Sequence, residues 1–258
     1  MLFSVLMQKS YRSKLQYRGS HLVQNIASSI FGFVYISIWV GIGEGRQLGE
    51  YGTSGMISYI AFNQAALWVA MFVNMGLGLP ETVRTGQIAF DLLRPVHLFY
   101  QLMSREYGSV IYQFIYKSLP IFLLYLIVFS LETPHHFSTW LWTLAALLFA
   151  SYINICINFL IGISALWTTE SGWLHGLNYS FYMLLSGFFI PIEWLPRWLQ
   201  GICAATPYQY QLYYPVRIYL ERDSYSVLAG SVLWCFLLTL ICLAVTVLAR
   251  RRVEVQGG

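Results

Sequence analysis

Two adjacent histidines, His135 and His136, are the residues whose type could most directly hold a metal ion. Imidazole is a common zinc ligand, but zinc sites in proteins combine three or four side chains from His, Cys, Asp and Glu. Glu132 is the one acid beside this pair, and no cysteine accompanies it. The pattern favours solvated loop histidines over a metal site, and we expect no metal on this chain.

The residue pattern gives little indication of nucleotide binding or covalent catalysis. The G-x-x-x-x-G-K-[ST] loop that cradles phosphates is absent, so this chain cannot bind ATP in the usual way. Gly41, Gly43 and Gly45 do not follow a strand, although Gly41 and Gly45 form a weak helix-packing signal. No paired carboxylates or nucleophile and base can be argued from spacing. We expect no catalytic residue, no cofactor and no nucleic-acid partner.

Polar side chains within apolar stretches are the remaining functional candidates. Gln64, Trp68 and Phe72 share a helix face at four-residue spacing, which suits either packing or the lining of a substrate path. Asn154 and Asn158 lie one helical turn apart, and there we expect hydrogen bonding between helices.

A single charged residue, Lys117, falls inside the apolar stretches. It lies roughly two turns from the nearer end, so its long side chain can reach the membrane interface. We expect that arrangement rather than a buried charge relay. Pro120, three residues later, predicts a kink in the same helix.

The elements that carry these residues must be membrane helices. Of the 258 residues, 57% are hydrophobic and 10% are charged, whereas a soluble domain carries roughly 25% charged residues. So few charges cannot cover a water-facing surface, and most of the outer surface must meet lipid or other apolar protein. Aromatic residues, at 17%, suit the Trp and Tyr belts of membrane interfaces.

Six windows are apolar enough to span a bilayer, which takes about 20 residues each. They comprise residues 21–43, 56–79, 109–131, 137–169, 171–192 and 224–249. Residues 198–216 lack charge but contain two prolines and three glutamines, so we place them outside the hydrocarbon or in a shielded re-entrant helix. The sequence predicts an all-α, polytopic membrane protein with one transmembrane domain, residues 1–258.

The distribution of Lys and Arg predicts the orientation. With six spans, ten basic residues face one side and four face the other, apart from Lys117. The richer side holds both termini and the second connection, and by the positive-inside rule it is the cytoplasm. The poorer side holds Arg46, Arg197, Arg217 and Arg222.

Residues 1–20 predict an amphipathic helix in the cytoplasmic interface. Leu2, Val5 and Leu6 have helical spacing, and basic residues follow them toward the lipid phosphates. The alternative is a frayed cytoplasmic tail.

The connection over residues 80–107 predicts a compact cytoplasmic element. Pro80 suits the first turn of a short helix, Gly86 its end, and Pro95 the end of the piece that follows. Its exposed apolar residues are expected to be Ile88, Phe90, Leu92 and Leu93. Such a surface suits docking of a soluble partner, or equally contact with lipid headgroups.

The outer loop over residues 193–223 contains a predicted amphipathic helix at 193–200, with Pro196 in its first turn. Tyrosines and prolines follow, a composition typical of the outer interface. The helix is expected to be either re-entrant or interfacial.

These two loops carry a family resemblance. The run from Gly86 to Pro95, which ends Leu92-Leu93-Arg94-Pro95, resembles the cytoplasmic signature of ABC-2 type exporter permeases. The run from Leu185 to Ile192, followed by Glu193-Trp194-Leu195-Pro196, is similar to the same family, as are Thr206 to Tyr210 and Tyr214 to Arg217. The six-span plan extends the resemblance over most of the chain.

The resemblance implies the permease subunit of an ATP-driven exporter in a bacterial plasma membrane. It implies partner ATPase subunits that carry ATP and Mg, a second permease subunit, identical or related, and surrounding lipid. Residues implied in coupling to the ATPase are Arg84, Gly86, Phe90, Asp91, Leu92 and Arg94. Residues implied along the translocation path are Tyr35, Trp39, Asn63, Trp68, Tyr182 and Phe189.

Two other functions compete with the exporter. A membrane scaffold or assembly factor would have no transport path and no nucleotide-dependent partner. A membrane enzyme is less well supported, because no predicted span centre contains Asp or Glu.

Overall fold

The computed structural model describes residues 2–45, 48–168 and 170–256, apart from the side chains of residues 17, 18, 20 and 253–256. Arg46 and Thr169, which the charge count and the fourth predicted span include, lie outside this part, as does the side chain of Arg18. The described residues form helices and loops without strands, which confirms the all-α prediction.

Thirteen α-helices are described, with shorter turns of helix between them. The α-helices are α1 (Leu2–Lys14), α2 (Arg18–Gly45), α3 (Gly52–Ala70), α4 (Leu79–Arg84), α5 (Gln87–Leu93), α6 (Leu98–Gln113), α7 (Leu119–Phe129), α8 (Phe137–Ile163), α9 (Ala165–Thr168), α10 (Gly172–Leu185), α11 (Arg197–Ala204), α12 (Tyr213–Tyr219) and α13 (Leu228–Gln256). The 3₁₀ turns are η1 (Leu15–Tyr17), η2 (Gly49–Tyr51), η3 (Met75–Gly78), η5 (Ile192–Trp194), η6 (Pro207–Tyr210) and η7 (Tyr225–Val227). A π-helical turn, η4 (Phe114–Ser118), joins α6 to α7.

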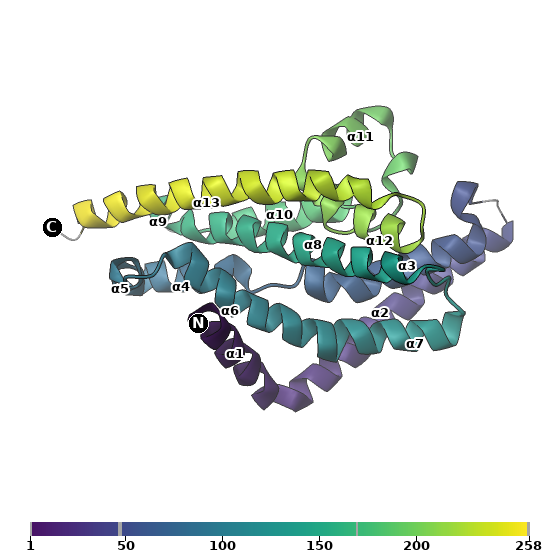
Figure 1. Ribbon diagram of the computed structural model, residues 1–258, viewed down its shortest axis with the longest axis horizontal. Helices are drawn as coiled ribbons and strands as arrows, with labels where there is room; N and C mark the ends of the chain where they lie inside the picture. Colours follow the sequence, from purple (N-terminus) through teal and green to yellow (C-terminus); the bar gives the residue numbers. More distant parts are fainter. Residues whose placement is uncertain (1, 46–47, 169, 257–258) are drawn as a thin grey trace.

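The long helices lie roughly along one axis, with the short elements at its two ends (Figure 1). Helices α4 and α5 and the C-terminus lie at one end, and α12 and the end of α7 lie toward the other. Helix α2 crosses the others obliquely, and α8 packs between α3 and α13. The core runs along this axis and is filled by aromatic and aliphatic side chains of α3, α6 and α8.

Five helical segments of the described residues are long and apolar enough to cross a membrane: His21–Gly45, Gly49–Arg84, Leu98–Phe129, Phe137–Thr168 and Tyr225–Arg252. The fifth predicted span, 171–192, is different. Helix α10 has 14 residues there, about 21 Å of helix, against a hydrocarbon core of roughly 30 Å. The structure thus has a helical segment long and apolar enough to cross a membrane at five of the six predicted spans.

Three further boundaries differ from the predictions. Regular helix in the second span ends at Ala70, where Met71 leaves the helical region (φ −125°), and Gly76, Leu77 and Gly78 further on all have positive φ. The third helix starts at Leu98 rather than 109, since its first turns are held by α1. In the outer loop the helix is α11, which begins at Arg197, after Pro196 rather than around it.

Helix α1 lies directly on α6. A Cβ atom at Gly108 of α6 would collide with the backbone carbonyl of Met7, so glycine permits this close approach. The rings of Phe3 and Tyr11 contact Tyr107 and Tyr112, respectively, which extends the contact along both helices. The N-terminal segment is thus a helix held by the transmembrane domain, and its interfacial position in the bilayer stays a prediction.

Candidate functional site

The break after α10 is built by side chains of α2 and α3. Gly187 has φ +75°, a conformation that favours glycine, and it ends the helical run. Its carbonyl accepts hydrogen bonds from the Tyr59 hydroxyl (2.6 Å) and from Nδ2 of Asn63 (3.2 Å), both fully buried on α3. The hydroxyl of Tyr35 donates to the Phe189 carbonyl. Side chains of α2 and α3 therefore satisfy the carbonyls of Gly187 and Phe189 in the segment that follows α10.

A groove of about 380 Å³ opens beside this break, between α2, α3 and α10. Non-helical backbone at membrane depth is tolerated where it is buried in protein or lines a cavity, and the 188–189 pair lines this one. The groove is lined by Gln24, Ala27, Ser28, Phe31, Gln64, Leu67, Trp68, Phe72, Tyr179, Met183, Phe188 and Phe189. Its wall combines aromatic rings with a few polar groups, the usual composition of a small-molecule site.

The residues predicted along the path divide into two groups. Trp68 and Phe189 line the groove, and so do Gln64 and Phe72 from the predicted α3 face. Tyr35 lies next to the groove, with its ring stacked at 5.9 Å from that of Phe188.

The other three predicted path residues are buried in the core and do not line this groove, and their place along a translocation path stays a prediction. Asn63 holds the break after α10, Trp39 packs its ring against that of Trp194, and Tyr182 is 1% exposed. The physical reason is helix rotation: Asn63 and Gln64 are adjacent, so they point in directions about 100° apart.

Eight of the twelve lining residues escaped prediction from the sequence, among them Gln24 and Ser28 on α2, and Tyr179 and Met183 on α10. Both pairs have four-residue spacing, so each lies on one face of its helix. This periodicity was a usable signal, but only the packing shows that the two faces meet across one groove.

Lys117 is buried rather than extended to the interface, which corrects the prediction. Its side chain is 5% exposed, its Nζ donates to Oε1 of Gln24 at 2.7 Å, and it lies 3.7 Å from the centre of the Trp68 ring. Both partners line the groove. A primary ammonium group thus lies directly behind the groove wall.

The π-helical turn η4 places Lys117 there. Pro120 lacks an N–H and leaves the carbonyl of Tyr116 without its helical partner, and that carbonyl accepts a hydrogen bond from Nδ2 of Asn25 at 2.7 Å. Ser118 donates to the carbonyl of Ala65 on α3. The helix therefore has a widened turn just before Pro120, bonded to both α2 and α3, and the predicted kink at Pro120 stays a prediction.

The predicted inner element is formed by α4 and α5, which end before Gly86 and before Pro95 as expected. Phe90 and Leu93 are 65% and 81% exposed, whereas Ile88 and Leu92 are 3% and 7% exposed. The prediction that Ile88 and Leu92 belong to an exposed apolar surface is wrong. The period of α5 turns these two inward to hold the element on the bundle.

The charged residues of this element pair locally. Arg84 bonds Glu81 at 2.7 Å and Arg94 bonds Asp91 at 3.2 Å, each pair three residues apart on the chain. The Arg84 pair is well exposed, with side-chain exposures of 75% and 62%. Such pairs contribute little to stability, and they leave charged groups at the surface for other contacts.

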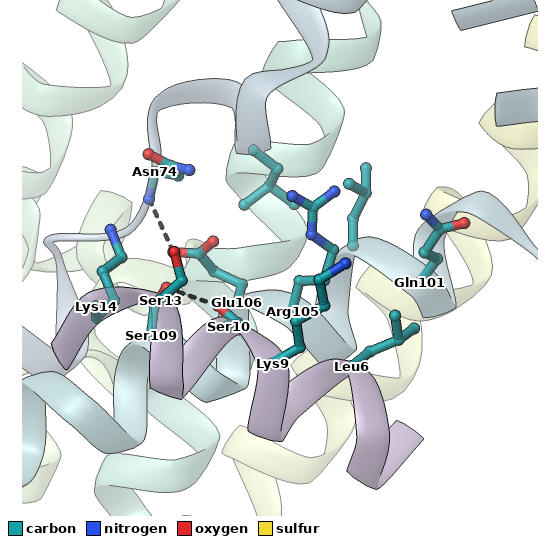
Figure 2. Close-up of a pocket in the computed structure, with 12 residues that line it drawn as sticks. Leu6, Lys9, Ser10, Ser13, Lys14, Asn74, Gln101, Arg105, Glu106 and Ser109 are labelled. Carbon is teal, nitrogen blue, oxygen red and sulfur yellow. Dashed lines mark hydrogen bonds between the residues drawn. The ribbon is translucent and has the colours of Figure 1, made fainter. Parts of the chain in front are cut away.

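The inner element is attached to the bundle by the segment 71–78. Gly76 packs against Gly162 of α8, and the backbone N–H of Asn74 donates to Oε1 of Glu106 at 2.9 Å. Figure 2 shows Glu106 pointing from α6 toward Asn74, next to Lys14 of α1. This carboxylate, 5% exposed, joins α6 to the segment that connects α3 with the inner element.

A second cavity, of about 430 Å³, surrounds Glu106 between α1 and α6. Lys9, Lys14 and Arg105 line it together with Ser10, Ser13, Ser109 and Gln101 (Figure 2). Three cations face one carboxylate here, so the cavity has a positive character. The sequence predicted that Lys9 and Lys14 face lipid phosphates, and in the structure they line this cavity.

The outer loop is fastened by an ion-pair cluster around Arg217. Its guanidinium bonds Glu193 (2.7 Å), Glu50 (3.0 Å) and Asp223 (2.6 Å), and the Tyr51 hydroxyl donates to the same Glu193 oxygen at 2.6 Å. Burial acts to lower the pKa of Arg217, but the bond to Asp223 and the surrounding groups raise it above its ordinary value. The cluster joins η2, η5 and α12 into one outer structure.

The histidine pair lies in the same outer region, where the backbone N–H of His136 donates to Glu221 at 3.1 Å. Among the described residues, no group of three or more His, Cys, Asp and Glu side chains is placed to hold a metal ion.

Comparison with known proteins gives one family. The model of the ABC-2 family transporter proteins matches residues 24–254. Neither the curated proteins nor the solved structures provide a match.

Proposed function

The chain belongs to the ABC-2 family of transporter membrane proteins, and on that premise we propose that it is the permease subunit of an ATP-driven exporter. The observation that carries this proposal is the broken helix α10 beside the groove between α2, α3 and α10. Discontinuous membrane helices beside a cavity are typical of transporter substrate sites. A scaffold has no need of a helix broken inside the membrane.

We place the path for cargo along this groove. Trp68 and Phe189 contribute its lining, and Tyr35 and Asn63 support it by holding the backbone of residues 187–189. Two permease subunits, identical or related, would enclose the path between them. The cargo would leave past the outer loop, which the Arg217 cluster holds together.

The driving energy would come from separate ATPase subunits, which carry ATP and Mg. Helices α4 and α5 offer the dock: Phe90 and Leu93 give an exposed apolar contact, and Arg84, Asp91 and Arg94 give charged groups around it. Gly86 separates the two helices, and Leu92 acts from inside by anchoring α5. In this arrangement the element faces the cytoplasm of a cell whose plasma membrane holds the chain, with both termini on the same side.

A movement of α4 and α5 would be transmitted to the groove through two connections. The segment 71–78 leads directly into α3, which carries Gln64 and Trp68, and Glu106 links the same segment to α6, which continues to Lys117. Coupling of this kind is mechanical, so no residue of this chain performs covalent chemistry.

The test is co-purification from mild detergent, with mass spectrometry to identify partners that carry a phosphate-binding loop and an ATPase assay on the eluate. Two variants address the dock: Phe90→Ser, and Arg84→Glu combined with Arg94→Glu. Trp198→Ser is the matched control, because Trp198 on α11 is 69% exposed, as Phe90 is 65% exposed, but lies in the outer loop.

The expected result is an ATPase that accompanies the wild type and Trp198→Ser and is lost from both dock variants. Retention of the ATPase by both dock variants would refute the assignment of α4 and α5. A wild type that purifies without any nucleotide-binding partner would refute the exporter and favour the membrane scaffold.

A further inference from the structure

Lys117 carries a buried charge that no acid of the described residues neutralises. None of the ion pairs among those residues includes Lys117, and its polar contacts are the Gln24 amide and the Trp68 ring, both neutral. An ionisable side chain within a membrane span is costly, and it normally faces a partner or a pathway. An anionic partner for Lys117 must therefore come from a molecule other than the described residues of this chain.

The groove next to Lys117 contains a second unused polar group. Gln64 is 1% exposed and lines the groove, and its Nε2 atom has no hydrogen-bond partner among the described residues. An amide N–H and an ammonium group are both donors that bind carboxylate or phosphate oxygens. The groove wall thus contains an unpaired donor, and the Lys117 ammonium group lies behind Gln24 and Trp68 of the same wall.

The rest of the groove is apolar. Phe31, Phe72 and Phe189 are 58%, 39% and 47% exposed and line it together with Met183. A molecule that fills the groove must therefore combine an acidic group with an apolar body. A volume of about 380 Å³ is at the small end of the roughly 300–1,000 Å³ range of small-molecule sites, which favours a single apolar chain over a two-chain lipid.

A polar row extends along α6 from the basic cavity of Figure 2 toward Lys117. Arg105, Ser109, Gln113 and Lys117 follow one another at four-residue spacing, so they run along one face of α6 and its continuation. Arg105 and Ser109 line the basic cavity, and the buried Oε1 of Gln113 has no partner among the described residues. This row places polar groups of α6 between the basic cavity and the π-helical turn that contains Lys117.

We propose that the groove binds a single-chain amphipathic anion, whose acidic group pairs with Lys117 and Gln64 and whose chain lies on the aromatic wall. This names the cargo class of the transporter and so rests on the proposed function.

The experiment uses the full chain in phosphatidylcholine nanodiscs without any ATPase. The probes are three photoreactive single-chain amphiphiles that share one alkyl chain and end in a carboxylate, an alcohol or an amine. Labelled peptides are mapped by mass spectrometry, and apparent affinities come from probe titration. The variants are Lys117→Met, Lys117→Arg and Phe72→Ala.

The carboxylate probe is expected to label peptides of α2, α3 or α10, with about tenfold higher affinity than the alcohol, since a charge-assisted hydrogen bond exceeds a neutral one by about that factor. We expect Lys117→Met to reduce the affinity of the carboxylate probe to that of the alcohol probe. Lys117→Arg should retain the preference for the carboxylate probe. Phe72→Ala should weaken binding of the carboxylate and alcohol probes equally. This result distinguishes the loss of the positive charge from the loss of the apolar wall.

Three results would overturn the proposal: equal labelling by all three probes, an unchanged preference in a folded Lys117→Met, or displacement of the carboxylate by phosphatidylglycerol at equal mole fraction. The last would identify a resident lipid instead of cargo. Because no ATPase is present, these outcomes are independent of the co-purification test, and either result can fail while the other stands.

Discussion

Two cations with little solvent exposure, Arg217 and Lys117, have opposite surroundings in this protein. The side chain of Arg217 in the outer loop is 13% exposed and lies among three carboxylates and a tyrosine hydroxyl. Lys117 in the third long helix is 5% exposed and contacts an amide and an aromatic ring. Burial of charge without a partner is expensive, so a cation that serves the fold brings its own acids. By this comparison Arg217 is structural and Lys117 is kept for a partner.

The largest expected effect is from Arg217→Met. Its removal leaves Glu193, Glu50 and Asp223 close together without a counter-ion, and breaking such a partly buried cluster should cost about 2–4 kcal/mol. The measurement is thermal unfolding in detergent, with Arg217→Lys as the conservative variant that recovers part of the loss. A melting temperature unchanged from wild type would remove the distinction between the two cations.

Gly187→Ala should cause the next largest loss of stability. Alanine at φ +75° costs roughly 1–2 kcal/mol, and its Cβ would also lie 2.7 Å from the Tyr59 hydroxyl. Gly176→Ala in the middle of α10 is the control, because no atom lies within 4 Å of its added Cβ and alanine favours helix by roughly 0.5–1 kcal/mol. Equal melting temperatures for the two variants would show that the break beside the groove is not held as described.

Lys117→Met should leave stability within about 1 kcal/mol of wild type, or raise it, because an apolar side chain replaces an unpaired buried charge. Transport or probe binding should fall in the same variant. The paired measurement is a melting curve and the carboxylate affinity on one preparation. A loss of stability as large as that of Arg217→Met would make Lys117 structural.

The smallest effect is expected from Arg84→Ala. Its exposed pair with Glu81 contributes no more than about 0.5 kcal/mol to folding, so the melting temperature should not change measurably. ATPase activity recovered on co-purification should nevertheless decrease, which would set the inner element apart from the outer cluster. A change in melting temperature without a change in recovered ATPase would reverse that assignment.

The long apolar windows could be predicted from the sequence because a spanning helix needs little more than length and apolar composition. Gly86 and Pro95 likewise ended α4 and α5 where their backbone preferences indicate. The broken fifth span could not be predicted in this way. It contains no Lys, Arg, Asp or Glu, and the break depends on Tyr59 and Asn63, which come from α3 and bond the Gly187 carbonyl.

Helix α5 of the inner element also combines features that the sequence predicts with features that only packing decides. The sequence identified its position and its apolar content, but Leu92 and Phe90 differ in exposure because only one of them faces the bundle. For Lys117, the expectation that the side chain reaches the interface rested on length alone. The widened turn η4 and the groove wall on α3 decide its actual direction.

Composition and periodicity by themselves determined that this protein is a helical membrane protein with a structured loop at each end, because hydrophobicity and backbone preference act over neighbouring residues. Tertiary structure alone decided which polar residues meet. Gln24, Gln64 and Lys117 come from three different helices, and their shared position at one groove depends on helix rotation and packing, which no local pattern specifies.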